Sequence, residues 1–546
     1  MTAFYIQQFG CRATQADGAA LERQLLDRGC TQALDPATAA IVVLNTCTVT
    51  AAADAQARDA IRKIHAQNPQ ARLIVTGCYA QRAPEELASL PGVTWVVGNS
   101  HKPQIPDLVT QIAPVVPAFA PDYQTAIAHQ TVIPSEASNP LFPPLSPDAH
   151  FHSVGVGAGL ASPSAPQFAK TPHLGAPSAP AQILTGDIFA HPEFLSAPIQ
   201  GGESHHTRPI LKIQDGCNNR CSFCVIPYVR GKSRSLPPDA IIREIQKLVA
   251  QPILAVHSPA SEIPVAQALL PVFSSSLHST PSDSQSQSFP AREIVLSGIN
   301  LGTYGRDLTP CAEFLDLLRR ILDETTIERL RISSIEPQDV TQDLIDLFAS
   351  TDRIAQHFHM PLQSASDPIL ASMHRWYRAE HYARRVDLIR DRLPNAALGA
   401  DVIAGFPGET ESDHAATISF IEQRPFTYLH VFSYSPRPGT KAAQSPNQVP
   451  SHIIKRRARE LRALSEAKSA AFRQSQLNRT LRVLTLHRNP HDERAGRTPA
   501  LSSNYLTFSI PGNHSHNRWL EIEVPPNDSA AVTADTNDRS VGASLA

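Results

Sequence analysis

Apolar and polar positions alternate over the first 112 residues in the manner of an α/β domain. Short apolar, β-branched runs such as AIVVL and LIV are typical of buried parallel strands. Between them lie segments that place apolar residues on one side of a helix. We expect strands at 3–7, 40–44, 73–75 and 93–97, and helices at 18–28 and 54–68.

A second series of strands and helices runs from residue 208 to residue 445. Regular alternation predicts parallel strands joined by right-handed crossovers, and hence an open or closed (β/α) barrel. We expect strands at 210–213, 294–296, 329–332, 357–360, 397–404 and 429–432, and helices at 239–249, 312–324, 368–373 and 380–393.

The rest of the chain divides into five segments. Residues 446–477 have the pattern of a basic helix. The short runs LRVLTL, NYLTFSI and WLEIEV predict a small antiparallel all-β barrel over 478–526. Segments 113–207 and 252–291 are rich in Pro, Ala and Ser without any period, so we expect disordered insertions. The polar tail 527–546 is expected to be disordered as well.

Composition adds few constraints. The 546 residues carry a formal net charge of −2, which argues against a strongly basic nucleic-acid binder but says nothing of local patches. No apolar run approaches the roughly 18 residues of a membrane span. The start, MTAFYIQQFGC, lacks the pattern of a signal peptide. We therefore expect a cytoplasmic, monomeric enzyme with no membrane contact.

Three cysteines, Cys217, Cys221 and Cys224, stand at C-x₃-C-x₂-C spacing in DGCNNRCSFC. Thiolates suit zinc and iron–sulfur clusters. A closed zinc site normally takes four protein ligands, and the chain contains no second C-x₂-C pair. The spacing therefore favours a cluster with three protein ligands and one iron open to a small molecule, with structural zinc as the alternative.

Cys11, Cys47 and Cys78 each follow an expected strand of the first domain. Strands of one parallel sheet end at one edge, so these cysteines could converge on a second metal site. The alternative is three buried cysteines that pack as small apolar residues. Cys30 and Cys311 lack this setting and are interpreted as structural.

The C-x₃-C-x₂-C loop resembles that of the radical S-adenosylmethionine (SAM) enzymes. Several motifs in order resemble their methylthiotransferase family, and the resemblance covers about 1–112, 208–250, 292–445 and the C-terminal module. These motifs are FGCRATQADG, NTCTVT, GCYAQR, DGCNNRCSFCVIPYVRGKSRS, LSGINLGTYGRD, ISSIEP, MPLQSASDPIL, ADVIAGFPGET and FSYSPRPGT.

The resemblance implies two 4Fe–4S clusters and SAM. Cys217, Cys221 and Cys224 would hold the catalytic cluster that cleaves SAM, while Cys11, Cys47 and Cys78 would hold an auxiliary cluster. It also implies an electron donor of flavodoxin or ferredoxin type, but leaves the sulfur donor unknown. Candidate SAM contacts lie near the ends of barrel strands, where barrel active sites gather; the alternative for each is an ordinary loop residue. These candidates are Gly298, Asn300, Ser333, Glu336, Gln363 and Asp401.

Members of this family act on a hypermodified adenosine at position 37 of tRNA, in two versions, or on a ribosomal protein. FGCRATQADG, DGCNNRC and YVRGKSRS resemble the branch that converts N6-threonylcarbamoyladenosine to its 2-methylthio derivative. The isopentenyladenosine branch usually reads EGCN and has acidic residues where this chain has Lys232. We therefore predict the threonylcarbamoyl substrate, with isopentenyladenosine or a ribosomal protein as alternatives.

Local charge favours tRNA as the partner. Basic residues crowd 451–479, although a solvated helix would explain them equally. Arg230, Lys232 and Arg234 are candidate RNA contacts near the chemistry. GRTPALSSNYLTFSI resembles a TRAM domain, whose Asn-Tyr pair corresponds to Asn504 and Tyr505, with Tyr505 expected to stack on a base. A rival hypothesis is a non-enzymatic RNA-binding protein stabilised by a metal.

Overall fold

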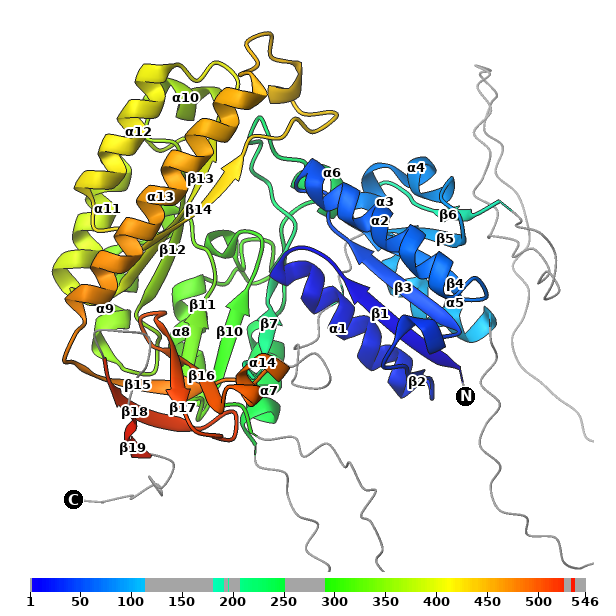
Figure 1. Cartoon of the computed structure of the whole chain (residues 1–546), viewed down its shortest axis with the longest axis horizontal. Coiled ribbons are helices and arrows are strands. Elements are labelled where there is room, and N and C mark those ends of the chain that lie inside the picture. The colour runs from blue at the N-terminus through cyan, green and yellow to red at the C-terminus, as the bar shows by residue number, and fades with distance from the viewer. Residues whose placement is uncertain are drawn as a thin grey trace, which may run out of the picture.

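The computed structural model describes residues 2–112, 180–190, 195, 207–250, 290–524 and 532–535. These residues form an N-terminal α/β domain, a barrel-like core and a C-terminal β module that packs against the core (Figure 1). Most of the predicted insertions 113–207 and 252–291, and most of the predicted tail 527–546, lie outside the described residues. Within the part that is described, no helix has the length and apolar character needed to cross a bilayer.

The N-terminal domain is a six-stranded parallel sheet with helices on both faces. Successive residues of its strands alternate between two apolar cores, as both-sided burial requires. Its strands, in sheet order, are β2 (Thr31–Gln32), β1 (Ala3–Gln8), β3 (Ile41–Thr46), β4 (Arg72–Gly77), β5 (Val93–Gly98) and β6 (Gln182–Leu184). Helices α1 (Arg12–Asp27) and α5 (Ile105–Ile112) cover one face, and α2 (Ala51–Gln67), α3 (Cys78–Arg82) and α4 (Pro84–Ala88) the other.

Strand β6 corrects the prediction that all of 113–207 is disordered. It pairs in parallel with β5, and Leu195 is buried in the core next to α1 and α5. Without β6, the backbone groups along that edge of β5 would lack a partner, which explains why a segment of low-complexity composition is ordered here.

The core confirms the predicted (β/α) barrel. Six parallel strands form two three-stranded sheets, joined where Ser334 bridges to His359. In order along the wall they are β7 (Ile210–Lys212), β10 (Glu293–Ser297), β11 (Arg329–Ile332), β12 (His357–Gln363), β13 (Ala397–Ala404) and β14 (Tyr428–Ser433). The helices of the core are α7 (Pro238–Val249), α8 (Phe314–Glu324), α9 (Gln342–Ser350), α10 (Asp367–Ser372), α11 (Ala379–Arg392) and α12 (Glu411–Gln423). Of these, α9 and α12 were not predicted.

The C-terminal module is an antiparallel sheet, as predicted. In sheet order its strands are β17 (Thr507–Pro511), β16 (Arg497–Ser502), β15 (Thr480–Thr485), β18 (Trp519–Glu523) and β19 (Val532–Asp535). Strand β19 corrects the prediction that the whole tail is disordered, because it completes the open edge of β18.

The turn between β16 and β17 closes the barrel at the N-terminal end of its strands. Arg331 is fully buried in β11 and donates to the carbonyl oxygens of Ser502 (3.0 Å) and Ser503 (3.1 Å). The neighbouring Arg329 donates to the Leu501 carbonyl at 3.0 Å, and both guanidiniums bond to buried Glu293. The buried guanidiniums at this end of the barrel therefore find their hydrogen-bond acceptors in the backbone of the C-terminal module.

The predicted basic helix is α13 (Ser451–Ser475), and most of its charge is used inside the protein. Arg457 is buried against Glu409, and Arg456 pairs with Glu411 and Glu460. Lys468 donates to two backbone carbonyls of the core. The cations that are exposed and without an ion-pair partner among the described residues are Lys455, Arg459 and Arg462. Helix α13 therefore packs mainly against β13 and β14. Its three exposed cations form one narrow strip that a phosphate backbone can contact.

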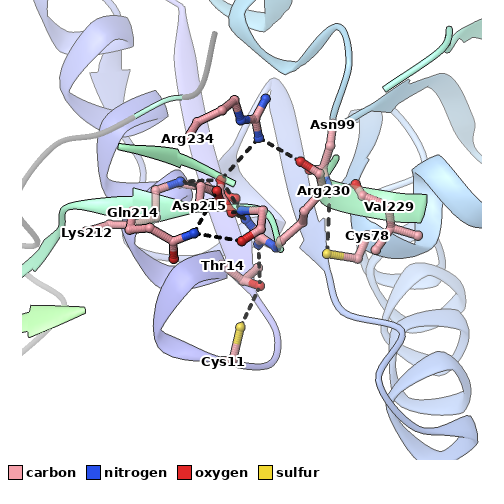
Figure 2. A network of polar contacts seen from close by, with 12 residues as sticks. Cys11, Thr14, Cys78, Asn99, Lys212, Gln214, Asp215, Val229, Arg230 and Arg234 are labelled. Carbon is pink, nitrogen blue, oxygen red and sulfur yellow. Dashed lines mark hydrogen bonds and ion pairs between the residues drawn. The ribbon is translucent and has the colours of Figure 1, made fainter. Parts of the chain in front are cut away.

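A buried set of charges joins the N-terminal domain to the core (Figure 2). Arg230, from the cysteine loop of the core, donates to Asp215 at 3.0 Å and to Asp17 of α1 at 3.1 Å. Lys212 bonds to the same two carboxylates, and Lys102 lies 2.8 Å from Asp17. Burial alone would raise the pKa of Asp215, but the cations of Arg230 and Lys212 lower it to about 2. These charges hold the two domains together.

The prediction that Arg230 contacts RNA is wrong. Its side chain is 2% exposed and its guanidinium is occupied by Asp215 and Asp17, so it cannot reach a phosphate. The sequence shows the positive charge but gives no sign of the carboxylate of Asp17, which lies on another domain.

We expect Arg230→Met to lower the free energy of unfolding by about 3–5 kcal/mol, because two buried carboxylates lose a cation. Lys232→Met, two residues away on an exposed side chain, should change it by no more than about 0.5 kcal/mol. Urea denaturation of the cluster-free protein measures both. Equal, small effects would mean that the buried charges do not hold the joint.

Candidate active site

The C-x₃-C-x₂-C loop follows the first barrel strand and ends in the short helix α6 (Ile226–Arg230). A hairpin of β8 (Gln214–Asp215) and β9 (Arg234–Ser235) ties the two ends of the loop together. Gly216 has a φ of +72°, and a Cβ there would lie 2.0 Å from the Lys232 carbonyl oxygen. The sharp turn before Cys217 therefore requires glycine.

Two side chains from outside the loop approach its sulfur atoms. Arg375 donates to Cys221 Sγ at 3.4 Å, and Asn300 Nδ2 lies 3.9 Å from Cys217 Sγ. Burial, with the neighbouring Cys221 and Cys217, raises the pKa of the Cys224 thiol to about 12. Because metals bind thiolates, a cation at this loop must displace protons that burial favours.

The cysteines of the N-terminal domain end three adjacent strands. Parallel pairing of β1, β3 and β4 places Cys11, Cys47 and Cys78 at one edge of the sheet. Gly10 has a φ of +93°, and a Cβ there would lie 2.3 Å from Cys47 Cβ, so glycine allows this close approach. Burial, together with the Cys78 and Cys11 thiols, raises the pKa of Cys47 to about 12.

The two cysteine sets lie on either side of the domain joint. Cys78 packs against Val225, which directly follows Cys224, and against Val229 of α6. Asn99 donates to the Val229 carbonyl at 2.7 Å and lies 3.5 Å from Cys78 Sγ (Figure 2). The folding of the two domains thus brings six cysteines that are far apart in sequence to one region.

Neither set has the geometry of a single-ion site. Tetrahedral zinc with Zn–S bonds of about 2.3 Å holds its sulfur ligands roughly 3.8 Å apart. Among the described residues, one set of three or more potential ligands brings its atoms within 4.8 Å of one another, and that set is His359, Asp401 and His430. Neither cysteine set meets this spacing in the described structure.

A cavity of about 440 Å³ opens between α1 and the barrel wall. All six residues predicted to contact SAM line it: Gly298, Asn300, Ser333, Glu336, Gln363 and Asp401. In the described structure, Asn300 Oδ1 and Ser333 Oγ are buried without a hydrogen-bond partner. Because buried polar atoms are nearly always paired, these two atoms fit a polar ligand such as SAM.

The cavity also contains a chain of hydrogen-bonded aromatic and acidic side chains, of which the sequence analysis predicted Asp401 alone. Tyr428 Oη lies 2.7 Å from His357 Nε2 and 3.0 Å from His359 Nδ1. His359 Nε2 lies 2.9 Å from Asp401, and His430 lies 3.4 Å from the same carboxylate. Both ring nitrogens of His359 are therefore engaged, which favours a hydrogen-bonded chain over a metal site.

A period of two would have found most of these residues. Side chains two residues apart in a strand point to the same face. Gln363 was predicted to line the site, and His359 and His357 lie two and three such steps before it in β12. Tyr428 and His430 are likewise two residues apart in β14. Arg375 gave no such signal, because it lies in the irregular segment after α10.

The basic residues of the cysteine loop differ in their access to solvent. Lys232 is exposed and stays a proposed RNA contact. Arg234 is 14% exposed, donates to the Arg230 carbonyl at 2.7 Å and lies 3.9 Å from Asp215. Arg234 therefore mainly stabilises the buried charges between the two domains.

Asn504 and Tyr505 do not form an RNA-facing surface on the C-terminal module. Asn504 is 4% exposed and donates to the Asn395 carbonyl and to Gln476, so its prediction as an RNA contact is wrong. Tyr505 stacks on His357 with ring centroids 4.2 Å apart and lines the cavity. It remains available to a ligand of the cavity, but not to RNA along the outer face.

A parallel barrel whose first strand leads into a C-x₃-C-x₂-C loop is the mark of a radical SAM enzyme. Comparison with known families agrees: residues 211–258 and 288–421 match the Radical SAM superfamily, and residues 3–98 match the uncharacterized protein family UPF0004.

Curated relatives are more specific. The chain is 30% identical over 522 residues to the Threonylcarbamoyladenosine tRNA methylthiotransferase MtaB of Aquifex aeolicus, covering 95% of this chain and 99% of that protein. The protein of the same name from Bacillus subtilis is 29% identical, with coverage of 94% and 91%. A tRNA-2-methylthio-N(6)-dimethylallyladenosine synthase of Syntrophobacter fumaroxidans is 30% identical, with coverage of 84% and 79%. The chain belongs to the radical SAM methylthiotransferase family.

Membership of the radical SAM superfamily implies an iron–sulfur cluster, and the contact between Arg375 and Cys221 bears on its reduction potential. We expect Arg375→Gln to make that potential more negative, because a buried positive charge beside the cluster favours the reduced state. An effect of ~1.4 kcal/mol corresponds to about 60 mV for one electron. A redox titration followed by electron paramagnetic resonance measures it. Arg384→Gln, on an exposed arginine of α11, is the matched control, and equal potentials in both variants would contradict the expectation.

Proposed function

We propose that this chain converts N6-threonylcarbamoyladenosine at position 37 of tRNA to its 2-methylthio derivative. The observation that carries the proposal is that two cysteine triads approach each other at the domain joint, where Cys78 packs against Val225, next to a cavity that Cys11 lines and that holds unpaired polar atoms. A single structural metal in an RNA-binding protein would need neither the second triad nor the cavity.

Six cysteines are proposed to hold two 4Fe–4S clusters: Cys217, Cys221 and Cys224 in the barrel loop, and Cys11, Cys47 and Cys78 in the N-terminal domain. When bound, the clusters and SAM supply a 5′-deoxyadenosyl radical and the sulfur and methyl groups for an unreactive C–H bond. An electron donor of flavodoxin or ferredoxin type is proposed as the source of the reducing electron.

The residues of the chain bind, orient and exclude water. Asn300 and Ser333 present the unpaired polar atoms, and Glu336 is held by Arg375 in a buried ion pair. Burial raises the pKa of Glu336 although Arg375 opposes the shift. The pKa of His357 is lowered well below its usual value by burial and by the charge of Arg331, so this ring is neutral at pH 7.

The substrate assignment rests on two supports. The first is that the Aquifex aeolicus and Bacillus subtilis relatives, which match 95% and 94% of this chain, carry the threonylcarbamoyl name. The cavity wall is also polar, with His357, His359, Asp401, Tyr428 and His430, which suits a polar substituent better than an isopentenyl group. Exposed Lys232 is proposed to contact the tRNA backbone.

Two clusters predict about eight iron atoms per chain after anaerobic reconstitution. Cys224→Ala should abolish release of 5′-deoxyadenosine, whereas Cys47→Ala should keep that release in part and stop methylthiolation. Cys311→Ala, on an exposed cysteine outside both sets, is the control and should retain full iron. Iron for one cluster only, or the reverse pattern of activities, would contradict the assignment.

In a strain that lacks this protein, 2-methylthio-N6-threonylcarbamoyladenosine should be absent from tRNA and its precursor should accumulate. Mass analysis of tRNA nucleosides measures both. Loss of the 2-methylthio isopentenyl nucleoside instead would contradict the proposed substrate and indicate that the protein acts on isopentenyladenosine.

A further inference from the structure

The two adenosine substrates of this family differ in charge at the N6 substituent. The threonylcarbamoyl group ends in a carboxylate and carries a hydroxyl, whereas the isopentenyl group is a hydrocarbon. A site for the first should offer a cation that no residue of the protein already uses, because burying an unpaired carboxylate is costly.

The charged groups of the cavity are paired, with one exception. Glu336 pairs with Arg375, and Asp401 faces His359 and His430. Arg12 lines the same cavity and, among the described residues, forms no ion pair and no hydrogen bond through its side chain. Arg12 is therefore the free cation of the lining in the described part of the chain.

The position of Arg12 suits a ligand that lies between the domains. It is half-buried at the first residue of α1, directly after Cys11, and no acidic residue lies in the first turn of that helix to neutralise it. Burial lowers the pKa of His357, and the charge of Arg12 adds a smaller effect in the same direction. Burial raises the pKa of Tyr428, and the charge of Arg12 opposes that shift. Arg12 therefore lines the cavity within electrostatic reach of the barrel wall, and it also borders a smaller cavity of about 200 Å³ next to Ile210 and His487.

The opposite rim carries a second donor. His430 is 53% exposed in its side chain, and one ring nitrogen points to Asp401, which leaves the other for a ligand. Arg12 from the N-terminal domain and His430 from β14 together frame an opening that has hydrogen-bond donors on both sides.

We propose that Arg12 binds the carboxylate of the threonylcarbamoyl group, with His430 as a donor at the rim. The inference rests on the proposed function, since it names the residue that selects the charged substrate over the hydrocarbon one. A planar guanidinium can hold a carboxylate through two parallel hydrogen bonds, and an uncharged substituent would leave Arg12 unpaired.

The test measures binding of the holoenzyme to an anticodon stem-loop in three forms: with N6-threonylcarbamoyladenosine, with the methyl ester of that nucleoside, and with unmodified adenosine. Arg12→Gln should weaken binding of the acid by roughly 10- to 100-fold, the range of a charge-assisted hydrogen bond. The wild type should lose a similar factor on the ester, and the variant should bind acid and ester equally.

Arg23→Gln is the matched control, because Arg23 lies on the same helix, is exposed and faces away toward Glu244. It should bind all three forms as the wild type does. Iron content and melting temperature of Arg12→Gln should match the wild type, and loss of iron would show that Arg12 serves the cluster instead.

Two further outcomes would overturn the inference. Equal weakening for all three stem-loops would mean that Arg12 contacts a phosphate. Equal affinity of the wild type for the acid and for its methyl ester would mean that no cation of the protein binds the carboxylate. The proposed function fails separately, if the wild type does not methylthiolate the threonylcarbamoyl substrate at all.

Discussion

The arrangement of the site depends on one set of buried charges. Asp17 belongs to the N-terminal domain, Asp215 and Arg230 belong to the cysteine loop, and they share hydrogen bonds in a region closed to water. Two carboxylates face the three cations Lys102, Lys212 and Arg230, so the excess positive charge lies beside the thiols of the N-terminal domain. A charge network of this kind has few alternative packings, because each displacement leaves a buried ion unpaired. The relation between the two cysteine sets is therefore fixed by the same residues that join the domains.

Much of the architecture could be predicted from the chain, because buried parallel strands leave continuous apolar runs. The four longer strands of the sheet and all six strands of the barrel were found this way. The convergence of cysteines at strand ends was found as well, since parallel pairing has one geometric outcome. Strands β2, β6 and β19 were missed because two to four residues carry no usable period, and they owe their order to a neighbour's open edge. Helix α12 was missed because its apolar face is narrow, with His414, Thr417 and Ile421 as its buried residues.

The sequence could not show which charged residues of distant segments pair with one another in the fold. Arg230 and Arg457 lie in basic segments of the kind expected on an RNA-binding surface. Both are buried against carboxylates supplied by other segments. Asn504 was assigned from a motif, but the motif lies in a turn that packs into the barrel. Charge along a chain predicts how many ions a protein has, and only the fold decides which of them water can reach. Among the described residues that the sequence analysis assigned to RNA binding or to the basic helix, Lys232 and the α13 strip of Lys455, Arg459 and Arg462 are exposed and form no ion pair.

The turn at 502–506 has a consequence for how this enzyme can be divided. Since its carbonyl groups satisfy Arg329 and Arg331, a shortened protein that ends before β15 would keep all six cysteines but open its barrel floor to solvent. Tyr505 would also no longer cover His357. The C-terminal module is thus not a detachable RNA-binding accessory, and grafting a module from a relative would require a matching turn to seal the same hole.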